Sequence, residues 1–587
     1  MKVKTTYYII ALLLLIVGQA GAQTKLEGRV LDSQTDEPII GATVAVVDEH
    51  SGVLTDMDGN FSVTVRNLPA VIKVSFVGYR ELQVDVYDAS EPIVIPLTEA
   101  VDVLQEVVVV GYSTQKRREL TSAISTVNKD LLKQSPTTVE NALAGAVAGL
   151  NVTTTSGQPG ASSNIRIRGG NSITGSNEPL YVIDGFIVYN DPEATRTGAS
   201  GADASLDPLS FLNPSDIESI EVLKDVSATA IYGTRGANGV IMITTKKGTK
   251  GRNNLRYAGT AGWSTAARRL EFLNAEQFTA LYNEINPKAP LPSPTHSYDW
   301  QDEALRTAFT QEHQLSAAGG DEHSRYAISG SYKGQEGIIV NTGLKRYAGR
   351  INYERTMWPN FVIGVNASGA YSALNGLRNV DRGTAGQAAK WASNTWMAVI
   401  TSAPTHPIYD AAGHFNYAPS PISQDLYTRN GEQVVGNPIS DLYNAKTRIA
   451  NSRLIASAFA EWEPVKHLKL KVQAGADLSN TRESNYSPSY TTTGLEYKGV
   501  ASVGSELANA EFTANYDREF DRLHHVALLA GYTAQRTDRS GYATTVRNFA
   551  NDVTGYNNLA AGSDLFSATS RAYISTLRSW LGRANYS

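Results

Sequence analysis

The stretch that decides the fold reads Leu468-Lys469-Leu470-Lys471-Val472-Gln473-Ala474-Gly475-Ala476-Asp477-Leu478-Ser479. Apolar side chains occupy every second position, and small or polar residues occupy the positions between them. Successive side chains of a strand point to opposite faces, so this alternation predicts a β-strand with one apolar and one polar face. Its length is that of a strand that crosses a lipid bilayer.

The same period of two recurs from about residue 251 to the end of the chain. It indicates about ten antiparallel strands, each with an apolar and a polar side. We expect these strands near residues 254–264, 310–319, 324–333, 345–354, 361–372, 452–463, 467–479, 503–517, 523–535 and 578–587.

The connections between these strands differ in length in a regular way. Short turns are expected around 320–323, 355–360, 464–466 and 518–522, whereas most of the intervening connections, such as 373–451, 480–502 and 536–577, are long. Outer-membrane barrels sort their connections like this, and a soluble β-sandwich has no reason to. The prediction is therefore the first part of a transmembrane antiparallel β-barrel. The last strand stops within its alternating pattern, so we expect the chain to be part of a longer protein.

The N-terminus predicts a secretory signal peptide over residues 1–22. Lys2 and Lys4 precede an apolar run from Tyr7 to Val17, and Ala20-Gly21-Ala22 supplies the small residues of a cleavage site. The run is too short for a membrane-spanning helix. Without this segment the formal net charge moves from −5 to −7, because two lysines and no acids are lost. An acidic mature chain argues against nucleic acid as a partner.

The sequence shows no sign of enzymatic chemistry. It contains no cysteine, which excludes disulfides, thiol catalysis and cysteine metal sites. Phosphate-loop, zinc-protease and serine-hydrolase motifs are absent. His524 and His525 begin an expected strand and should point to opposite faces, so they are poor candidates for a shared metal site. We therefore expect neither catalysis nor a cofactor.

Residues 23–100 predict a small β-sandwich, because short β-rich runs alternate with turn residues. Within it, residues 56–60 read Asp-Met-Asp-Gly-Asn, which resembles a calcium loop. The glycine is at the fourth position and the twelfth residue is Asn67 rather than glutamate, so a hairpin turn is the better interpretation.

Residues 120–250 predict a second, mixed α+β unit that is rich in glycine. Residues 140–148, and part of 216–232, have helical character. Strand-like runs cover residues 164–168, 180–183 and 239–245.

Between the two units, at residues 103–112, lies the run Val-Leu-Gln-Glu-Val-Val-Val-Val-Gly-Tyr. Consecutive valines favour a strand, because β-branched side chains are stiff and fit a pleated surface. Acidic residues precede the run, and Lys116, Arg117 and Arg118 follow it. Two interpretations stay open on these residues alone. The run is either a buried strand of a neighbouring domain or a strand that adds to the edge of a partner's sheet.

Several motifs resemble those of the SusC/RagA class of TonB-dependent outer-membrane transporters of Bacteroidota, and the resemblance covers essentially the whole chain. It implies a carboxypeptidase-regulatory-like domain over 23–100, a TonB box and linker over 101–119, a plug domain over 120–250 and a barrel from 251. Members of the class carry about 22 barrel strands, roughly twice the number expected here. The matching segments are residues 28–30, 38–44, 55–61, 77–79, 106–112, 157–160, 165–170, 179–185, 221–225 and 230–233.

For function, the resemblance implies active import of a large nutrient, an oligosaccharide or an oligopeptide, across the outer membrane. The implied partners are the energy transducer TonB with ExbB and ExbD, a SusD-like surface lipoprotein, the substrate and outer-membrane lipid. A siderophore or cobalamin receptor, a surface adhesin and an inactive fragment remain as alternatives. The implied TonB box comprises Glu106, Val107, Val108, Val109, Val110, Gly111 and Tyr112.

The plug motif implied by the resemblance comprises Arg166, Arg168, Gly169, Gly170, Asp184 and Gly185. Arg166 and Arg168 alternate onto one face of a strand, where they could hold the plug to the barrel or form a static structural salt bridge. Asp184-Gly185 is expected to shape a tight turn rather than to bind a ligand.

Overall fold

The computed structural model describes the chain from residue 24 to residue 586 with internal gaps. The expected signal peptide, together with Glu106, Gly111 and Tyr112, lies outside the described residues. The gaps are residues 34, 48–50, 77–78, 80, 99–106, 111–112, 117–123, 129–130, 132–137, 155, 174–175, 189–208, 252, 378–394, 419–436, 489–496 and 522–523.

The chain forms two compact units, residues 1–107 and 108–587. The first contains a β-sandwich, as the sequence predicts. One sheet has the order β4-β1-β7 and the other the order β3-β2-β5-β6, and their buried side chains form one core. The strands are β1 Thr24–Asp32, β2 Thr43–Val46, β3 Gly52–Leu54, β4 Asn60–Val65, β5 Ala70–Ser75, β6 Leu82–Val86 and β7 Ile93–Leu97.

The loop over residues 56–60 is a turn, but the prediction of a hairpin was wrong. It joins β3 to β4, and these strands belong to different sheets of the sandwich. The Asp56 carboxylate accepts hydrogen bonds from the backbone N–H groups of Asp58 and Asn60, at 3.0 and 2.8 Å. These bonds hold the carboxylate in place within the turn and lower its pKa. The sequence showed the turn residues but not which strands would pair across them.

The second unit begins with the plug unit, which we define as the described residues from Ile124 to Lys247. Its main sheet has the order β10-β15-β16-β13-β14, and a separate ribbon pairs β11 with β12. Apolar side chains pack on both faces of the main sheet. The strands are β10 Ile124–Thr126, β11 Leu150–Thr154, β12 Ser163–Ile167, β13 Leu180–Ile183, β14 Phe186–Val188, β15 Ile217–Leu223 and β16 Val240–Thr245, and the helices are α3 Val139–Leu143, η3 Pro214–Asp216, α4 Val226–Thr229 and η4 Ala230–Gly236.

The helical interpretation of residues 216–232 was only partly right. Its first half is β15, and helix begins only at Val226. The segment Ile217-Glu218-Ser219-Ile220 has apolar residues three apart, which suits a helix as well as a strand. This segment is a strand rather than a helix because it pairs with β10 on one side and with β16 on the other.

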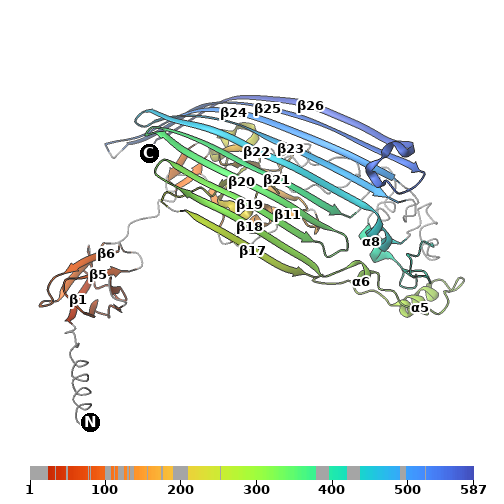
Figure 1. Ribbon diagram of the computed structural model, residues 1–587, viewed down its shortest axis with the longest axis horizontal. Coiled ribbons are helices and arrows are strands. Elements are labelled where there is room, and N and C mark those ends of the chain that lie inside the picture. Colours follow the sequence, from red (N-terminus) through yellow and green to blue (C-terminus); the bar gives the residue numbers. More distant parts are fainter. Residues whose placement is uncertain are drawn as a thin grey trace, which may run out of the picture. The chain divides into compact units, whose positions relative to one another are not determined.

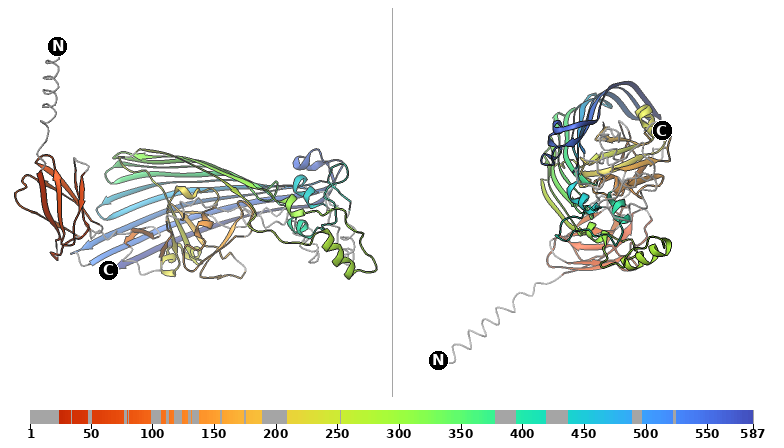
Figure 2. Two further views of the ribbon diagram at one scale, coloured as in Figure 1. Left: turned by 90° about the horizontal axis from the view of Figure 1, so that it is seen from below. Right: turned by 90° about the vertical axis from the view of Figure 1, so that its right-hand side faces the viewer.

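From Asn254 onward the chain forms one ten-stranded antiparallel sheet in strictly sequential order, β17 to β26 (Figure 1). The sheet curves around the plug unit (Figure 2). The predicted fold class is confirmed, and each expected strand is present. The strands are β17 Asn254–Ser264, β18 Ala308–Gly320, β19 Ser324–Glu336, β20 Gly343–Trp358, β21 Phe361–Gly376, β22 Lys446–Val465, β23 Leu468–Ser487, β24 Tyr497–Phe520, β25 His524–Phe549 and β26 Gly562–Tyr586.

Several strands are longer than predicted. The expected long connections 480–502 and 536–577 are in large part continuous ladder, which leaves only 488–496 and 550–561 between strands. The extra length lies at the end of the sheet that carries the long connections, which we call the loop end. There the outward side chains become polar, for example Asn480 and Arg482. The alternation therefore ends before the hydrogen-bonded pairing does.

The outer face of the sheet, which points away from the plug unit, carries an apolar band between two groups of aromatic side chains. Along β21 the outward residues run from Phe361 through Val365 to Tyr371. Ten residues at about 3.3 Å per residue span roughly 33 Å. Tilted by about 40°, this length covers about 25 Å, the height of the apolar band of an outer-membrane barrel.

Short helices lie in the connections at the loop end, and a small apolar cluster centred on Trp300 and Ile439 holds three of them together. No helix among the described residues is long and apolar enough to cross a membrane. The helices are α5 Ala275–Ile285, α6 Trp300–Ala304, α8 Thr395–Thr401, α10 Pro438–Asn444, η5 Gly555–Asn557 and η6 Leu559–Ala561.

Candidate functional site

The valine run contains the strand β8 Val107–Val110, whose partner among the described strands is β9 Ser113–Lys116, in a two-stranded sheet. The boundary between the two compact units falls inside this strand, between Val107 and Val108. β8 therefore belongs to neither the sandwich sheets nor the plug sheet. This placement fits an interdomain strand better than a buried core strand.

Arg168, from the predicted plug motif, forms an ion pair with Asp225, which also belongs to the plug unit. It follows the end of β12 with a positive φ of 57°, and its side chain is half exposed. Arg166 is exposed on one face of β12, because Ile165 and Ile167 are buried on the other. The partner of Arg168 agrees with a static salt bridge inside the plug rather than a link to the sheet.

Asp184 and Gly185 form the two-residue turn between β13 and β14, as expected. Both have positive φ values, 50° and 82°, and Ile183 pairs with Phe186 across them. Two central residues with positive φ define the tight hairpin turn that matches strand twist. Gly169 also has a positive φ, at 110°, whereas Gly170 lies next to Asn177.

Asp184 has a second role that the sequence did not reveal. Its carboxylate accepts hydrogen bonds from the backbone N–H and the hydroxyl of Thr245, at 2.9 and 2.5 Å. Arg350 of β20 donates to that same hydroxyl and to the Lys246 carbonyl oxygen. The plug turn is thus connected through Thr245 to the inner face of the ten-stranded sheet.

Asp216 is the second point at which the plug meets the sheet. Its carboxylate accepts hydrogen bonds from Gln314 Nε2 of β18 at 2.8 Å and from Ser329 Oγ of β19 at 2.7 Å. Burial raises the pKa of this carboxyl, although the Ser329 hydrogen bond and the charge of Arg350 act in the opposite direction. A cavity of about 270 Å³ lies beside it, lined by polar groups that include Lys246 and Arg256.

Two further ionic groups bridge plug and sheet. Glu354 of β20 is buried between Lys247 of the plug and Arg325 of β19. Glu312 of β18 accepts a hydrogen bond from Asn213 of the plug at 3.3 Å. The same carboxylate lies 3.4 Å from Lys333 and 3.6 Å from Arg346, both buried.

Apolar contacts complete the interface. Ile455 and Leu507 of the sheet belong to the same buried cluster as the core of the plug. Gly475 lies so close to the ring of Phe186 that an added Cβ would be 2.8 Å from it. The glycine in the opening stretch therefore lets a plug aromatic ring approach the backbone of β23.

Sequence analysis missed Asp216, Arg350, Glu312 and Glu354 as individual site residues. The available signal was the polar side of each alternating strand. Arg346, Arg350 and Glu354 occupy that side of β20, four residues apart, and all three are buried. Charged residues repeated on one face of a predicted barrel strand indicate that this face contacts polar groups of a domain inside the barrel.

The arrangement is a largely polar contact between a plug and a wall, with a cavity beside it. Among the described residues no group of three or more His, Asp or Glu side chains could hold a metal ion. His524 and His525 have separate partners, Tyr586 at 2.7 Å and Asp517 at 2.9 Å. The chemistry available here is the exchange of hydrogen bonds and ion pairs with water.

Two family models match the chain. Residues 116–240 match the TonB-dependent receptor plug domain, and residues 26–109 match the carboxypeptidase-regulatory-like domain.

Similar proteins include TonB-dependent receptor P3 of Formosa agariphila, 31% identical over 98% of this chain and 54% of that protein. TonB-dependent receptor SusC of Bacteroides thetaiotaomicron is 38% identical over 60% of this chain and 34% of that protein. A structure of the RagAB peptide importer in its open-open state matches with a TM-score of 0.68 and 26% identity. That match covers 82% of this chain and 55% of the other. The chain thus spans about half the length of the relatives it matches.

Proposed function

This chain belongs to the SusC-like TonB-dependent receptors, and on that premise we propose that its protein imports a nutrient across the outer membrane by TonB-dependent transport. The observation that carries the proposal is the plug unit packed across the inner face of the sheet. A filled barrel cannot pass a large solute until part of its contents moves. Transport by this protein therefore requires work on the plug.

The contacts between plug and sheet suit such movement. Asp216, Asn213 and Lys247 of the plug reach the wall through hydrogen bonds and an ion pair rather than through a continuous apolar interface. Polar groups that lose a protein partner can bind water instead, so the net cost of separation is modest, about 0.5–1.5 kcal/mol for a typical hydrogen bond. The neighbouring cavity, whose lining includes the polar groups of Asp216, Lys246 and Arg350, gives water a place from which to enter.

The segment from Glu106 to Tyr112 is the proposed TonB box. A TonB domain in the periplasm would add its strand to the backbone of Val107–Val110, energised by the ExbB and ExbD proteins of the inner membrane. Strand addition uses main-chain hydrogen bonds, so it grips an extended peptide with little demand on its side chains. The position of β8 between the two compact units supports this role.

Residues 1–22 serve in this proposal as a secretory signal, and the sandwich lies in the periplasm. A SusD-like lipoprotein is the proposed surface partner, by analogy with SusC and with the RagAB assembly. The substrate is an oligosaccharide or an oligopeptide. The similarity to the RagAB peptide importer supports an oligopeptide, and an oligosaccharide is the other substrate class implied by the motifs of this chain.

Energised uptake by the complete receptor tests the proposal. Deletion of residues 104–112 should abolish uptake while substrate still binds at the cell surface. Val108→Pro with Val110→Pro should have the same effect, because proline removes the N–H groups needed for strand addition.

The matched control is Val108→Thr with Val110→Thr, which keeps the β-branched shape and the N–H groups and should preserve uptake. Unchanged uptake after the deletion would exclude this mechanism. Unchanged cell adhesion in all variants, with no uptake in any, would instead favour a surface adhesin.

A further inference from the structure

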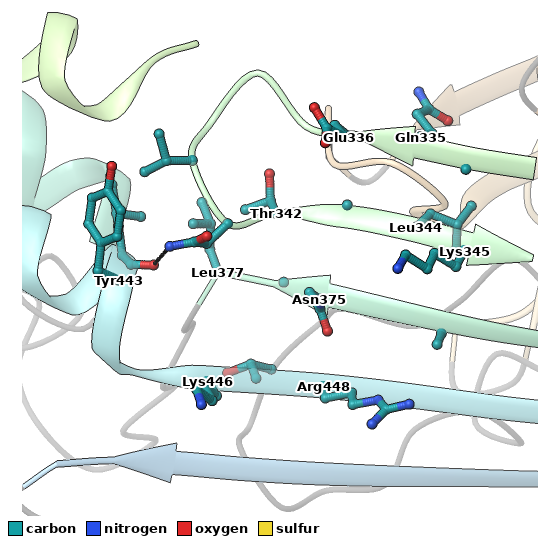
Figure 3. Close-up of a pocket in the computed structure, with 18 of the residues that line it drawn as sticks. Gln335, Glu336, Thr342, Leu344, Lys345, Asn375, Leu377, Tyr443, Lys446 and Arg448 are labelled. Atoms are coloured by element: carbon teal, nitrogen blue, oxygen red, sulfur yellow. Dashed lines mark hydrogen bonds between the residues drawn. The ribbon is translucent and has the colours of Figure 1, made fainter. Parts of the chain in front are cut away.

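A pocket of about 780 Å³ lies at the loop end of the sheet, over β19 to β22 (Figure 3). It is lined by strand residues, by Leu377, by Tyr443 of α10 and by Tyr556 of η5. Its basic residues are Arg306, Lys345, Lys446 and Arg448.

Three of these cations point away from the plug. On β20, Leu344 and Arg346 face inward, because Leu344 lies against Gly160 of the plug and Arg346 donates to the Ser210 carbonyl oxygen. Lys345 between them therefore faces outward, and its side chain is exposed.

On β22 the same logic applies. Ile449 packs with Leu344 and Leu374 in a small inward cluster. Lys446 and Arg448 are exposed and alternate with the buried Thr447 and Ile449, so they share the outward face with Lys345. The three cations thus lie on the outer face of the wall, while the lining also includes the inward-facing Leu344 and the buried Thr447.

The outward cations lack acidic partners within the described part of the chain. No carboxylate there forms an ion pair with Lys345, Lys446 or Arg448. Arg448 bonds to the hydroxyl groups of Tyr371, at 3.2 Å, and Tyr556. Two acidic residues line the pocket: Glu336 is 3.7 Å from Arg306, and Asp441 of α10 is buried.

The depth of the pocket relative to the apolar band is defined by the tyrosines beneath it. Tyr347 and Tyr371 pair across β20 and β21 on the outer face, and the ring of Tyr332 is tilted against that of Tyr347 with ring centroids 5.0 Å apart. Lys345 is two residues beyond Tyr347, a rise of about 7 Å along the strand. Lipid headgroups lie at this height, just past the aromatic girdle.

We propose that this outward pocket binds a phosphate group of the glycolipid in the outer leaflet, with the acyl chains lying against the apolar band below. Arginine offers a planar fork of donors to phosphate oxygens and lysine offers a compact charge, so the two together suit a phosphate monoester. The proposal rests on the outer-membrane placement proposed above. The proposed occupant is a lipid rather than a transported solute, because the three cations that would bind it face the lipid side of the wall.

The test measures lipid binding to the complete purified receptor in nanodiscs, by native mass spectrometry. Three probes are compared: monophosphoryl lipid A, the same lipid without phosphate, and inorganic phosphate as a competitor. We expect the combined Lys345→Ala, Lys446→Ala and Arg448→Ala substitutions to reduce occupancy by monophosphoryl lipid A at least tenfold. The dephosphorylated lipid should bind the unmodified receptor as weakly as monophosphoryl lipid A binds this triple variant.

The matched control is the combined Arg355→Ala, Lys466→Ala and Arg518→Ala variant, which removes three exposed cations at the opposite, turn end of the sheet. It should keep full occupancy. Equal occupancy in the two triple variants, or equal binding of the two lipids, would overturn the proposal. Displacement of the lipid by equimolar inorganic phosphate would overturn the lipid as the occupant in favour of a free anion.

Uptake assays separate this proposal from the proposed function. If the receptor binds the phosphorylated lipid but shows no TonB-dependent uptake, the lipid-site proposal stands and the transport proposal is refuted. If the receptor transports normally but binds no lipid through these cations, the transport proposal stands and the lipid-site proposal is refuted.

Discussion

The two faces of β23 differ as much as the inside and outside of a soluble protein, but in the opposite sense. The face toward the plug carries Gln473 and Asp477, both buried, whereas the outer face carries Val472, 52% exposed, and Leu478, 42% exposed. In water this arrangement would be unstable, because apolar surface would be solvated and charges buried. It is stable when lipid covers one face and a polar plug covers the other.

The largest expected effect comes from breaking the polar pairing on the inner face. The Asp477 carboxylate accepts two hydrogen bonds from Arg453, from Nε at 2.9 Å and from Nη2 at 2.6 Å, and both residues are buried. Asp477→Ala should lower the free energy of unfolding by about 3–5 kcal/mol, because it leaves a buried charge without its main partner. Urea titration of the receptor in lipid vesicles measures this value.

The double variant Arg453→Met with Asp477→Leu is the control, since it removes both charges and should cost much less. If the double variant were as unstable as Asp477→Ala, packing rather than charge would govern this face.

A charge on the outer face should have the next largest effect, and its size should depend on depth. Val472→Arg lies within the apolar band and should destabilise the folded state by about 2–4 kcal/mol. Asn480→Arg is on the same face of the same strand, beyond the band, and should cost about 0–1 kcal/mol. The same titration compares them, and equal costs at both positions would argue against lipid contact.

The inner face also depends on a plug that keeps its shape, and Glu178 makes that shape sensitive to pH. Its carboxylate accepts the Ile165 N–H of β12, with both oxygens at 3.1 Å. Burial raises its pKa from 4.5 to about 7, although the hydrogen bond and the charge of Arg166 act to lower it. The folded plug therefore binds this proton more tightly than the unfolded chain does.

Its stabilising contribution should be complete below about pH 4.5 and should disappear as the pH rises through 7. Because the carboxyl is only half-buried, we expect a smaller effect than for Val472→Arg. Hydrogen exchange at the Ile165 amide, corrected for intrinsic rates, should show more protection at pH 5 than at pH 8. Glu178→Gln should remove that difference, and a variant that keeps it would refute the assignment.

The smallest effect is expected at the turn that meets the wall. Gly185→Ala should cost about 1–2 kcal/mol, because a residue with a Cβ is strained at a φ of 82°. Gly185→Asn should cost less, since asparagine tolerates this conformation. Thermal unfolding compares the two, and equal losses would indicate that the contact with Gln473 matters more than the backbone.

The sequence predicted the architecture well because the membrane imposes a period of two that survives in every strand. The alternation in Leu468–Ser479 located β23 without reference to any partner. It failed where the outer face becomes polar, so the upper part of β23 at Asn480 and Arg482 was assigned to a loop. It also failed at β15, whose strand character depends on neighbours distant in the sequence.

The site was predictable only in part. The turn at Asp184-Gly185 follows from local conformational preference, and its tight-turn geometry is confirmed. The bonds from Asp184 to Thr245 and from Asp216 to Gln314 join residues more than sixty positions apart, which no local pattern specifies. The assignment of Glu106 to Tyr112 as the TonB box stays a prediction.

The most direct test of the two-faced wall is a cysteine scan of Leu468–Ser479. The chain contains no cysteine, so each single substitution can be spin-labelled without a background. In the receptor reconstituted in lipid, labels at 470, 472, 474, 476 and 478 should be relaxed by oxygen dissolved in the bilayer. Labels at 471, 473 and 477 should be shielded from it by the plug, and Gly475 is left unchanged because an added Cβ would clash with Phe186. A profile without a period of two, or equal oxygen access at all positions, would contradict the account.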